Sequence, residues 1–166
     1  MTSLSLFPFQ GSVIDKLRQG FALGHNHQLI VAPTGAGKTE MAMALMEAVR
    51  EKGNRCAMVL DRIVLCNQTS ERMQKYRIPH GVYQSGHWRF RAYEPIQICS
   101  AQTLERRGGL KELKLLIVDE AHQTRKSVVD FIKRNPDVKV VGLTATPFTK
   151  GLGKIYSNVV SSITTS

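Results

Sequence analysis

Residues 29–39, LIVAPTGAGKT, join an apolar run to a glycine-containing loop and to the start of a helical pattern. A polyphosphate is bound where several backbone N–H groups point inward and a helix N-terminus faces its negative charge. Gly35 and Gly37 let the backbone approach closely because neither carries a Cβ atom. Lys38 is placed to reach the β- and γ-phosphates, and Thr39 offers a hydroxyl to Mg²⁺. The predicted nucleotide contacts in this loop are Thr34, Gly35, Ala36, Gly37, Lys38 and Thr39.

The interpretation of this loop depends on the order strand, loop and helix, and not on the glycines alone. Ala32 occupies the position at which the strict phosphate-loop pattern has its first glycine. The alternative is a chance Gly-x-Gly-Lys-Thr run in a turn, which the flanking strand and helix patterns disfavour. We expect the side chain of Lys38 to face solvent when no ligand is bound.

A second chemical pattern follows at residues 115–122, LLIVDEAH, where two carboxylates end an aliphatic run. In open α/β sheets, ligands bind beyond the carboxyl ends of the strands, which is where Asp119 and Glu120 would lie. Asp119 is predicted to hold Mg²⁺ through water, because this ion keeps several of its waters. Glu120 is predicted to be the catalytic base that orients and deprotonates the attacking water, with Lys38 as its catalytic partner at the phosphates. The alternative is that the acidic pair only ends a strand or caps a helix.

Five short apolar runs, nearly unbroken by polar residues, are typical of strands buried on both faces of a sheet. They lie at residues 28–31, 57–60, 96–100, 115–118 and 138–143. Helical patterns alternate with them at residues 12–22, 38–50, 63–75 and 127–134, and a further strand is predicted at 80–84. This alternation indicates βαβ units and therefore an α/β fold in which helices cover a mainly parallel central sheet.

Length and charge limit the kind of protein that this chain can be. Its 166 residues and mass of 18.5 kDa suit a single domain over residues 1–166. Its 23 Lys and Arg against 13 Asp and Glu give a net charge of +10, which favours a polyanionic partner such as nucleic acid. The alternative is that the basic residues only maintain solubility.

The sequence gives no indication of a membrane or secreted protein. No apolar run approaches the roughly 20 residues of a membrane-spanning helix, and the first residues lack the basic segment of a signal peptide. Cys56, Cys66 and Cys99 match no zinc-binding spacing, and their odd number argues against a disulfide framework. We therefore expect a cytoplasmic protein without a membrane partner, with reduced cysteines in or beside the core.

Together these patterns resemble the superfamily 2 DEAH-box helicases and translocases, and among them the bacterial and phage relatives of type III restriction helicase subunits. Residues 119–122, DEAH, resemble motif II of the family, and residues 32–39, APTGAGKT, resemble motif I. Residues 143–147, LTATP, resemble motif III, and the three motifs follow the family's order. Weaker matches are FPFQ at 7–10, LDRIVLCNQ at 60–68, SAQTL at 100–104 and GLGKIY at 151–156.

The resemblance implies a three-layer, RecA-like P-loop NTPase domain that uses ATP and Mg²⁺. It implies that Gln10 reads the adenine base and that His122 belongs to the catalytic group by coupling the nucleotide site to motif III. The hydroxyls of Thr144 and Thr146 are suited to bond Asp119 or His122 in that coupling. The alternative for His122 and the two threonines is a structural role at the strand end.

In the family, ATP binds between two RecA-like domains, and this chain resembles only the first. The arginine finger belongs to the second domain, and such fingers contribute factors of about 10³–10⁵ in rate. We therefore expect an ATP-dependent helicase or ATPase whose partner is a second RecA-like domain in the full-length protein. The first domain alone is expected to bind nucleotide weakly, to hydrolyse it slowly or not at all, and not to unwind nucleic acid.

Helicases of this class hold one strand mainly by its backbone, through N–H groups, hydroxyls and basic side chains. The predicted nucleic-acid contacts are Arg62, Ile63, Gln102, Thr103 and Arg106. Asp61 or Arg62 stands where the family has a proline near the start of its motif Ia, and a solvated basic loop is the alternative at Arg106. The likeness to restriction and repair members favours DNA over RNA.

Three further interpretations stay open at the level of sequence. Residues 87–93, HWRFRAY, interleave aromatic and Arg side chains that can stack on bases, although packing over the sheet edge is favoured. Another P-loop NTPase, such as a GTPase or kinase, is possible, but the Asn-Lys-x-Asp guanine reader is missing. A non-catalytic nucleic-acid-binding module that regulates a partner is the third.

Overall fold

The computed structural model describes residues 8–32, 37–83, 91, 93–107, 112–145 and 152–161, without the side chains of residues 8–10, 105–107 and 161. The strands are β1 (His27–Val31), β2 (Arg55–Leu60), β3 (Gly81–Val82), β4 (Ile96–Ser100), β5 (Leu113–Val118), β6 (Lys139–Thr144) and β7 (Asn158–Ser161). The α-helices are α1 (Pro8–Ala22), α2 (Lys38–Glu51), α3 (Ile63–Lys75), α4 (Ala101–Arg107) and α5 (Lys126–Arg134). Two short 3₁₀ helices are η1 (Ala121–Gln123) and η2 (Leu152–Lys154).

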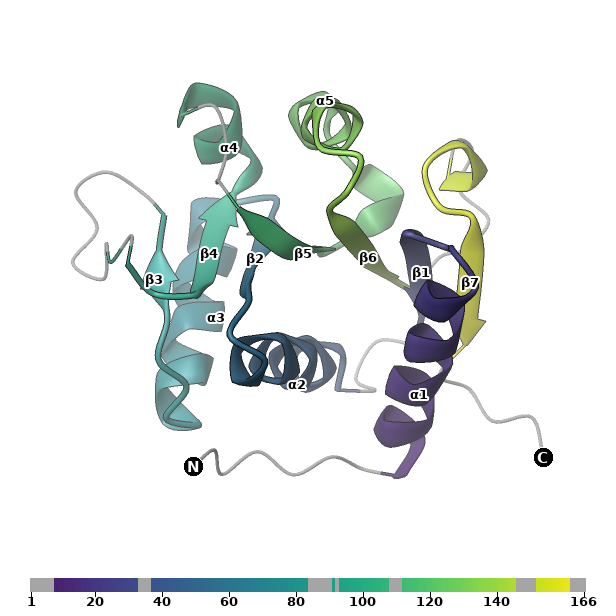
Figure 1. Cartoon of the computed structure of the whole chain (residues 1–166). Helices are drawn as coiled ribbons and strands as arrows, with labels where there is room; N and C mark the ends of the chain where they lie inside the picture. Colours follow the sequence, from purple (N-terminus) through teal and green to yellow (C-terminus); the bar gives the residue numbers. More distant parts are fainter. Residues whose placement is uncertain are drawn as a thin grey trace.

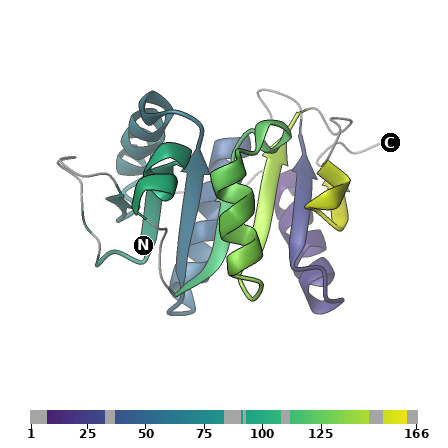
Figure 2. The same ribbon diagram turned by 90° about the horizontal axis from the view of Figure 1, so that it is seen from above.

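The strands form one sheet in the order β3-β4-β2-β5-β6-β1-β7. Every pairing between the described strands is parallel. Helices α1, α2 and α3 cover one face of the sheet, and α4 and α5 cover the opposite face (Figures 1 and 2). This three-layer arrangement confirms the α/β fold and the parallel sheet predicted from the sequence.

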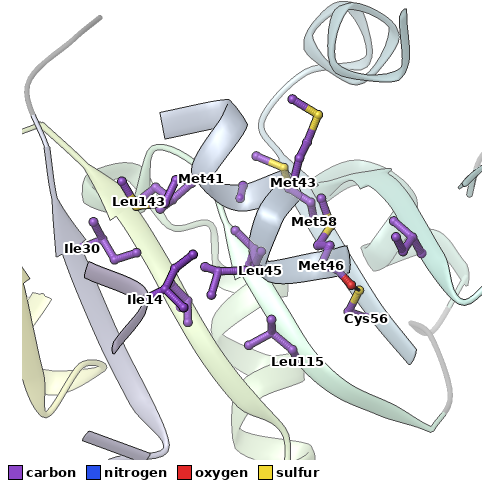
Figure 3. Close-up of a cluster of buried hydrophobic side chains, with 14 of the residues drawn as sticks. Ile14, Ile30, Met41, Met43, Leu45, Met46, Cys56, Met58, Leu115 and Leu143 are labelled. Atoms are coloured by element: carbon purple, nitrogen blue, oxygen red, sulfur yellow. Dashed lines mark hydrogen bonds between the residues drawn. The ribbon is translucent and has the colours of Figure 1, made fainter. Parts of the chain in front are cut away.

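The apolar runs are continuous because successive side chains of each central strand enter two different cores. In β5, Leu115 and Ile117 belong to the cluster shared with α1, α2 and α3, part of which is drawn in Figure 3. Leu116 and Val118 belong to the cluster shared with α4 and α5. From Leu115 to Val118 both faces of the strand are therefore apolar, and the next residue, Asp119, is polar and lies where the strand ends.

Strand β7 is an element that the sequence patterns did not reveal. Its four residues, NVVS, are too few to show the alternation of apolar and polar residues that marks a strand. The strand is attached to the sheet through a buried polar side chain in β1. Gln28 is fully buried, its Nε2 donates to the Leu17 carbonyl oxygen at 2.9 Å, and its Oε1 accepts from Asn158 Nδ2 at 2.7 Å. One side chain therefore joins α1, β1 and β7.

Helix α4 is the other element that was not predicted, and α1 starts earlier than residue 12. Ser100 ends β4 and at the same time caps α4, because its Oγ accepts from the backbone N–H of Thr103 at 3.1 Å. Strand β4 therefore passes directly into α4. No polar loop separates the strand pattern from the helix pattern in the sequence. The further strand predicted at residues 80–84 is present as the short edge strand β3.

The three cysteines are free and buried, as expected. Burial raises the pKa of the Cys56 and Cys66 thiols to about 12 and raises that of Cys99 as well, so all three remain protonated. In the part of the chain that the structure describes, no helix combines the length and apolar character needed to cross a membrane.

Residues 152–161 pack onto the sheet beside the turn that carries the two carboxylates. The ring of Tyr156 packs so closely on Gly142 that a Cβ atom there would lie 2.7 Å from Tyr156 Cζ and 2.9 Å from Ala121 Cβ. Tyr156 itself is buried, which raises the pKa of its hydroxyl to about 12. Gly142 is therefore required by this close approach, and a side chain there would push on both η1 and residues 152–161.

We predict that Gly142→Ala lowers the free energy of unfolding by about 1–3 kcal/mol, the usual penalty for overpacking a tight core site. Urea unfolding followed by circular dichroism would measure this change. The control is Gly153→Ala, because a Cβ at Gly153 meets no atom within 4 Å, and its effect should stay within about 0.5 kcal/mol. Equal destabilisation by the two substitutions would contradict the proposed packing constraint.

Candidate active site

The order of the strands brings the two sequence patterns to one edge of the sheet. Strand β6 lies between β1 and β5, with Thr144 paired to Val31 and Gly142 paired to Val118. The backbone N–H of Ala32 donates to the Thr144 carbonyl oxygen at 3.0 Å, which extends the β1–β6 ladder toward the glycine loop. Because all three strands are parallel, their carboxyl ends lie side by side at this edge.

The lysine of the loop meets the second carboxylate of the strand tip. Gly37 has a φ of 76°, in the left-handed region that favours glycine, and α2 begins at the next residue. Lys38 Nζ lies 3.7 Å from Glu120 Oε1, and the Lys38 side chain is 14% exposed. The expectation that Lys38 faces solvent is therefore wrong, because its ammonium group turns inward toward the carboxylate.

Glu120 is held in an unusual backbone conformation. Its φ of 49° places a non-glycine residue in the left-handed region, directly before η1. Such a conformation costs about 1–3 kcal/mol and persists where the surrounding structure enforces it, most often at functional sites. Here the turn reverses the chain at the end of β5 and directs the carboxylate toward the loop of β1.

His122 continues this chain of contacts toward motif III. Its Nε2 lies 3.4 Å from Glu120 Oε2, and its Nδ1 lies 3.0 Å from Thr144 Oγ1. Thr144 is fully buried at the end of β6, so its hydroxyl holds the ring on one side. The four side chains from Lys38 to Thr144 thus form a continuous polar row. The structure brings His122 and Thr144 together as the coupling interpretation requires.

The carboxyl group of Asp119 is partly buried at this edge of the sheet. Its backbone N–H donates to the Val59 carbonyl oxygen at 3.0 Å, which fixes the tip of β5 against β2. Burial raises the pKa of the Asp119 carboxyl above its usual range, and the neighbouring Glu120 adds to the rise while Lys38 opposes it. A perturbed carboxyl in this position at a sheet edge is typical of a functional site.

The side chains present at this edge fit a magnesium–nucleotide complex. Asp119 and Glu120 supply carboxylate oxygens and Thr39, in the first turn of α2, supplies a hydroxyl, which are the oxygen donors that Mg²⁺ prefers. Among the side chains described, no group of three or more His, Cys, Asp or Glu could hold a metal ion unaided.

Several predicted site residues are outside what the structure describes. Thr34, Gly35, Ala36 and Thr146 lie outside the described residues, so their assignments stay predictions. The backbone of Gln10 lies in the first turns of α1, and its side chain is among those not described.

The predicted nucleic-acid contacts fall into two groups. Arg62 and Ile63 are exposed where β2 passes into α3, and Gln102 is exposed in the first turn of α4. Thr103 is buried, with its hydroxyl 3.0 Å from Ser100 Oγ, so its side chain serves the start of the helix. Arg106 lies in α4, and its side chain is not described.

One ion pair at this edge was not anticipated. Arg125 Nε lies 2.5 Å from Asp61 Oδ1 and joins the tip of β2 to the residue that precedes α5. The guanidinium of Arg125 lowers the pKa of the Asp61 carboxyl. One indication of this ion pair was present in the sequence, because Asp61 or Arg62 replaces the proline that the family has near the start of motif Ia. That replacement indicated position 61 or 62 but not its partner Arg125, which lies 64 residues away from Asp61.

Comparison with known proteins gives a family and a fold. The family model described as "Type III restriction enzyme, res subunit" matches residues 3–149. No curated protein matches the sequence at a significant level.

Several solved structures share the fold at low sequence identity. The UvsW helicase from bacteriophage T4 aligns with a TM-score of 0.75 and 15% identity, over 93% of this chain and 59% of that chain. The Hef helicase domain from Pyrococcus furiosus aligns with 0.72 and 23%, over 94% and 38%. A nuclease-deletion mutant of the type ISP restriction-modification enzyme LlaGI aligns with 0.73 and 18%, over 95% and 20%. The chain thus spans 59% or less of these proteins, and the likeness confirms the RecA-like α/β fold.

We predict that Asp119→Asn stabilises the protein at neutral pH in the absence of metal. Because the folded-state pKa of Asp119 is raised, its ionised form opposes folding, and this penalty grows as the pH rises through the unfolded-state pKa toward the folded-state value. The free energy of unfolding should increase by about 0.5–2 kcal/mol at neutral pH. The gain should shrink near pH ~3, where the wild-type carboxyl is protonated in both states.

Urea titrations with EDTA at the two pH values would measure the effect of this substitution. The control is Asp137→Asn, an exposed residue away from the site, with an expected change of less than about 0.5 kcal/mol. A loss of stability in Asp119→Asn at neutral pH would contradict the electrostatic account.

Proposed function

Because the chain belongs to the type III restriction enzyme res-subunit family, we propose that it is the ATP-binding motor domain of a DEAH-box superfamily 2 helicase or translocase. The observation that carries the proposal is the approach of Lys38 Nζ to Glu120 Oε1 at 3.7 Å. It joins the glycine loop after β1 to the acidic turn after β5, across the intervening tip of β6. A phosphate-binding lysine and a water-activating carboxylate have to share one small space to act on one nucleotide.

The residues at this edge divide the work between binding and proton transfer. Lys38 and the backbone that precedes α2 bind the phosphate tail, and the N-terminus of α2 adds its partial positive charge. Asp119 and Thr39 would hold Mg²⁺, which would supply positive charge to offset the negative charge of the phosphates. Glu120 orients the attacking water and accepts its proton.

The contacts of Glu120 indicate how nucleotide binding would prepare the base. Its two oxygens face Lys38 at 3.7 Å and His122 at 3.4 Å, so both are engaged. When phosphate enters, Lys38 exchanges its carboxylate partner for phosphate oxygens, and one oxygen of Glu120 becomes free to accept a proton. His122 keeps the other oxygen and, through Thr144, links the position of the base to the tip of β6.

Nucleic acid is the second ligand in this proposal, and DNA is favoured over RNA. Arg62, Ile63 and Gln102 are exposed at the starts of α3 and α4, on elements that follow two adjacent strands, β2 and β4. Exposed basic and polar groups of this kind bind a strand by its phosphates without reading sequence. The structurally similar LlaGI was solved in complex with a DNA substrate mimic, which supports the choice of DNA.

Turnover is proposed to need a second RecA-like domain. No arginine of the described residues approaches the Lys38–Glu120 pair in an ion pair, so the charge that an arginine finger supplies has to come from elsewhere. The solved relatives are longer than this chain, which agrees with a further domain in the working motor.

We predict that this chain binds a labelled DNA single strand with an affinity that changes when ATP and Mg²⁺ are present. In Lys38→Ala the affinity for ATP should fall by about tenfold or more, because the phosphates lose a charge-assisted contact. The same variant should bind DNA as the wild type does without nucleotide, and should no longer respond to ATP. Fluorescence anisotropy with DNA and calorimetry with ATP would measure the two affinities.

The control for this experiment is Lys133→Ala, an exposed lysine on α5 that removes the same charge. It should keep the nucleotide response of the wild type. Binding of DNA that is identical with and without ATP would favour a non-catalytic nucleic-acid-binding module, and a failure to bind ATP at all would reject the motor assignment.

We predict a different result for Glu120→Gln in the full-length motor. Glutamine keeps the shape of the side chain but cannot accept the proton, so ATP should still bind while hydrolysis falls by about 10²–10⁴. Steady-state hydrolysis and equilibrium nucleotide binding would be measured side by side, with exposed Glu51→Gln as the matched control. If Lys38→Ala and Glu120→Gln lost nucleotide affinity equally, the division of roles would be wrong.

A further inference from the structure

A hollow of about 430 Å³ lies between α1 and α2, at the opposite end of the strands from the candidate active site. It is lined by the second half of α1, the last turns of α2 and the first residues of β5 and β6. Figure 1 shows the two helices separated on this face of the sheet. Lys114 and Lys139, near the starts of β5 and β6, belong to its lining, whereas Asp119 and Thr144 lie at or beyond the ends of the same strands.

The floor of the hollow is formed by apolar core residues that keep a small exposed fraction. Ile14 and Leu45 remain 7% exposed and Leu115 remains 4% exposed, whereas Leu17 and Met46 of the same cluster are completely buried. In Figure 3 the side chains of Ile14, Leu45 and Leu115 come from α1, α2 and β5 and converge on one region. An apolar side chain that entered the hollow would therefore complete the packing of this cluster.

The rim of the hollow carries only positive charge. Arg18, Lys52, Lys114 and Lys139 line it together with apolar residues, and no Asp or Glu is among the lining residues. None of these four cations forms an ion pair with another described residue, and Lys139 Nζ instead lies 5.0 Å from the centre of the Phe21 ring. Four like charges with no counter-charge in an ion pair among the described residues favour an anionic ligand.

We propose that this hollow is a docking site for an amphipathic, acidic helix of a partner protein. Apolar side chains of that helix would fill the floor, and flanking Asp or Glu side chains would meet the rim. The chemistry disfavours nucleic acid, because the floor is aliphatic and the Phe21 ring is already covered by Lys139. The proposal does not depend on the ATPase assignment, since the hollow is remote from the strand tips.

The probe for this test is a synthetic helical peptide of about 18 residues with Leu on one face and Glu on both sides of that face. A scrambled peptide of identical composition keeps the charge but loses the apolar face. Fluorescence anisotropy with the 166-residue chain should show binding of the amphipathic peptide and at least about tenfold weaker binding of the scrambled one.

Two variants locate the binding surface. Lys52→Glu/Lys114→Glu reverses two exposed rim charges and should weaken binding of the amphipathic peptide by about tenfold or more. Ala48→Trp fills the hollow without changing its charge and should weaken binding by a similar factor. The control Lys126→Glu/Lys133→Glu makes the same charge change on α5, across the sheet, and should stay within about twofold. Thermal unfolding of each variant verifies that it is folded.

Equal binding of the two peptides would overturn the proposal, because charge alone would then explain it. Equal weakening by the rim variant and by the α5 control would overturn it as well. An oligothymidylate strand provides the remaining test: if it displaces the peptide, and if Lys52→Glu/Lys114→Glu loses oligothymidylate affinity to the same extent, the surface belongs to nucleic acid and the partner-helix proposal is wrong.

Discussion

The balance of charge at the tip of β5 is the constraint on which the site depends. Two adjacent carboxylates, Asp119 and Glu120, follow a strand whose faces are both buried, and desolvation together with the charge of Glu120 opposes the ionisation of Asp119. Lys38 is the cation that offsets this repulsion in the protein without ligand. It can do so only because β6 lies between β1 and β5, so that the strand tips carrying the loop and the acidic pair meet at one edge.

The same charge balance is what the proposed magnesium nucleotide would change. A divalent cation held by Asp119 would add positive charge where the two carboxylates repel each other. The phosphate tail in turn would supply the anion that Lys38 needs when it leaves Glu120. In the proposed complex the cation would therefore meet the acidic turn and the phosphates would meet Lys38, while the left-handed backbone of Glu120 fixes the direction of its carboxylate.

Much of this arrangement could be predicted from the sequence because its signals are local. The continuous apolar runs of β1, β2, β4, β5 and β6 indicated strands buried on both faces. The residues that follow β1 and β5 indicated a phosphate-binding loop and an acidic pair. Parallel pairing then requires those residues to share one edge. The sequence did not predict that Lys38 turns inward, because its partner Glu120 lies far away in sequence. The attraction between the lysine and the two carboxylates can be recognised only once the order of the strands is known.

The features that escaped the sequence depend on contacts between distant segments. Strand β7 is held by Gln28 through Asn158, and α4 starts directly after the last residue of β4. Neither element is therefore marked in the sequence by a hydrophobic periodicity or by a preceding polar loop. The hollow between α1 and α2 arises from the spacing of two helices. That spacing is set by packing on the sheet and not by the pattern of either helix.

The ion pair between Asp61 and Arg125 has a consequence for measurements in salt. It joins the segment that carries Arg62 to the turn that follows Asp119 and Glu120, and Arg125 is half exposed, so counterions weaken it. If the chain binds DNA as proposed, raising the ionic strength would act twice, once by competing for the DNA phosphates and once by weakening this ion pair between the two loops. The slope of log affinity against log salt would then include a contribution from the protein's own ion pair as well as from the phosphates that it contacts.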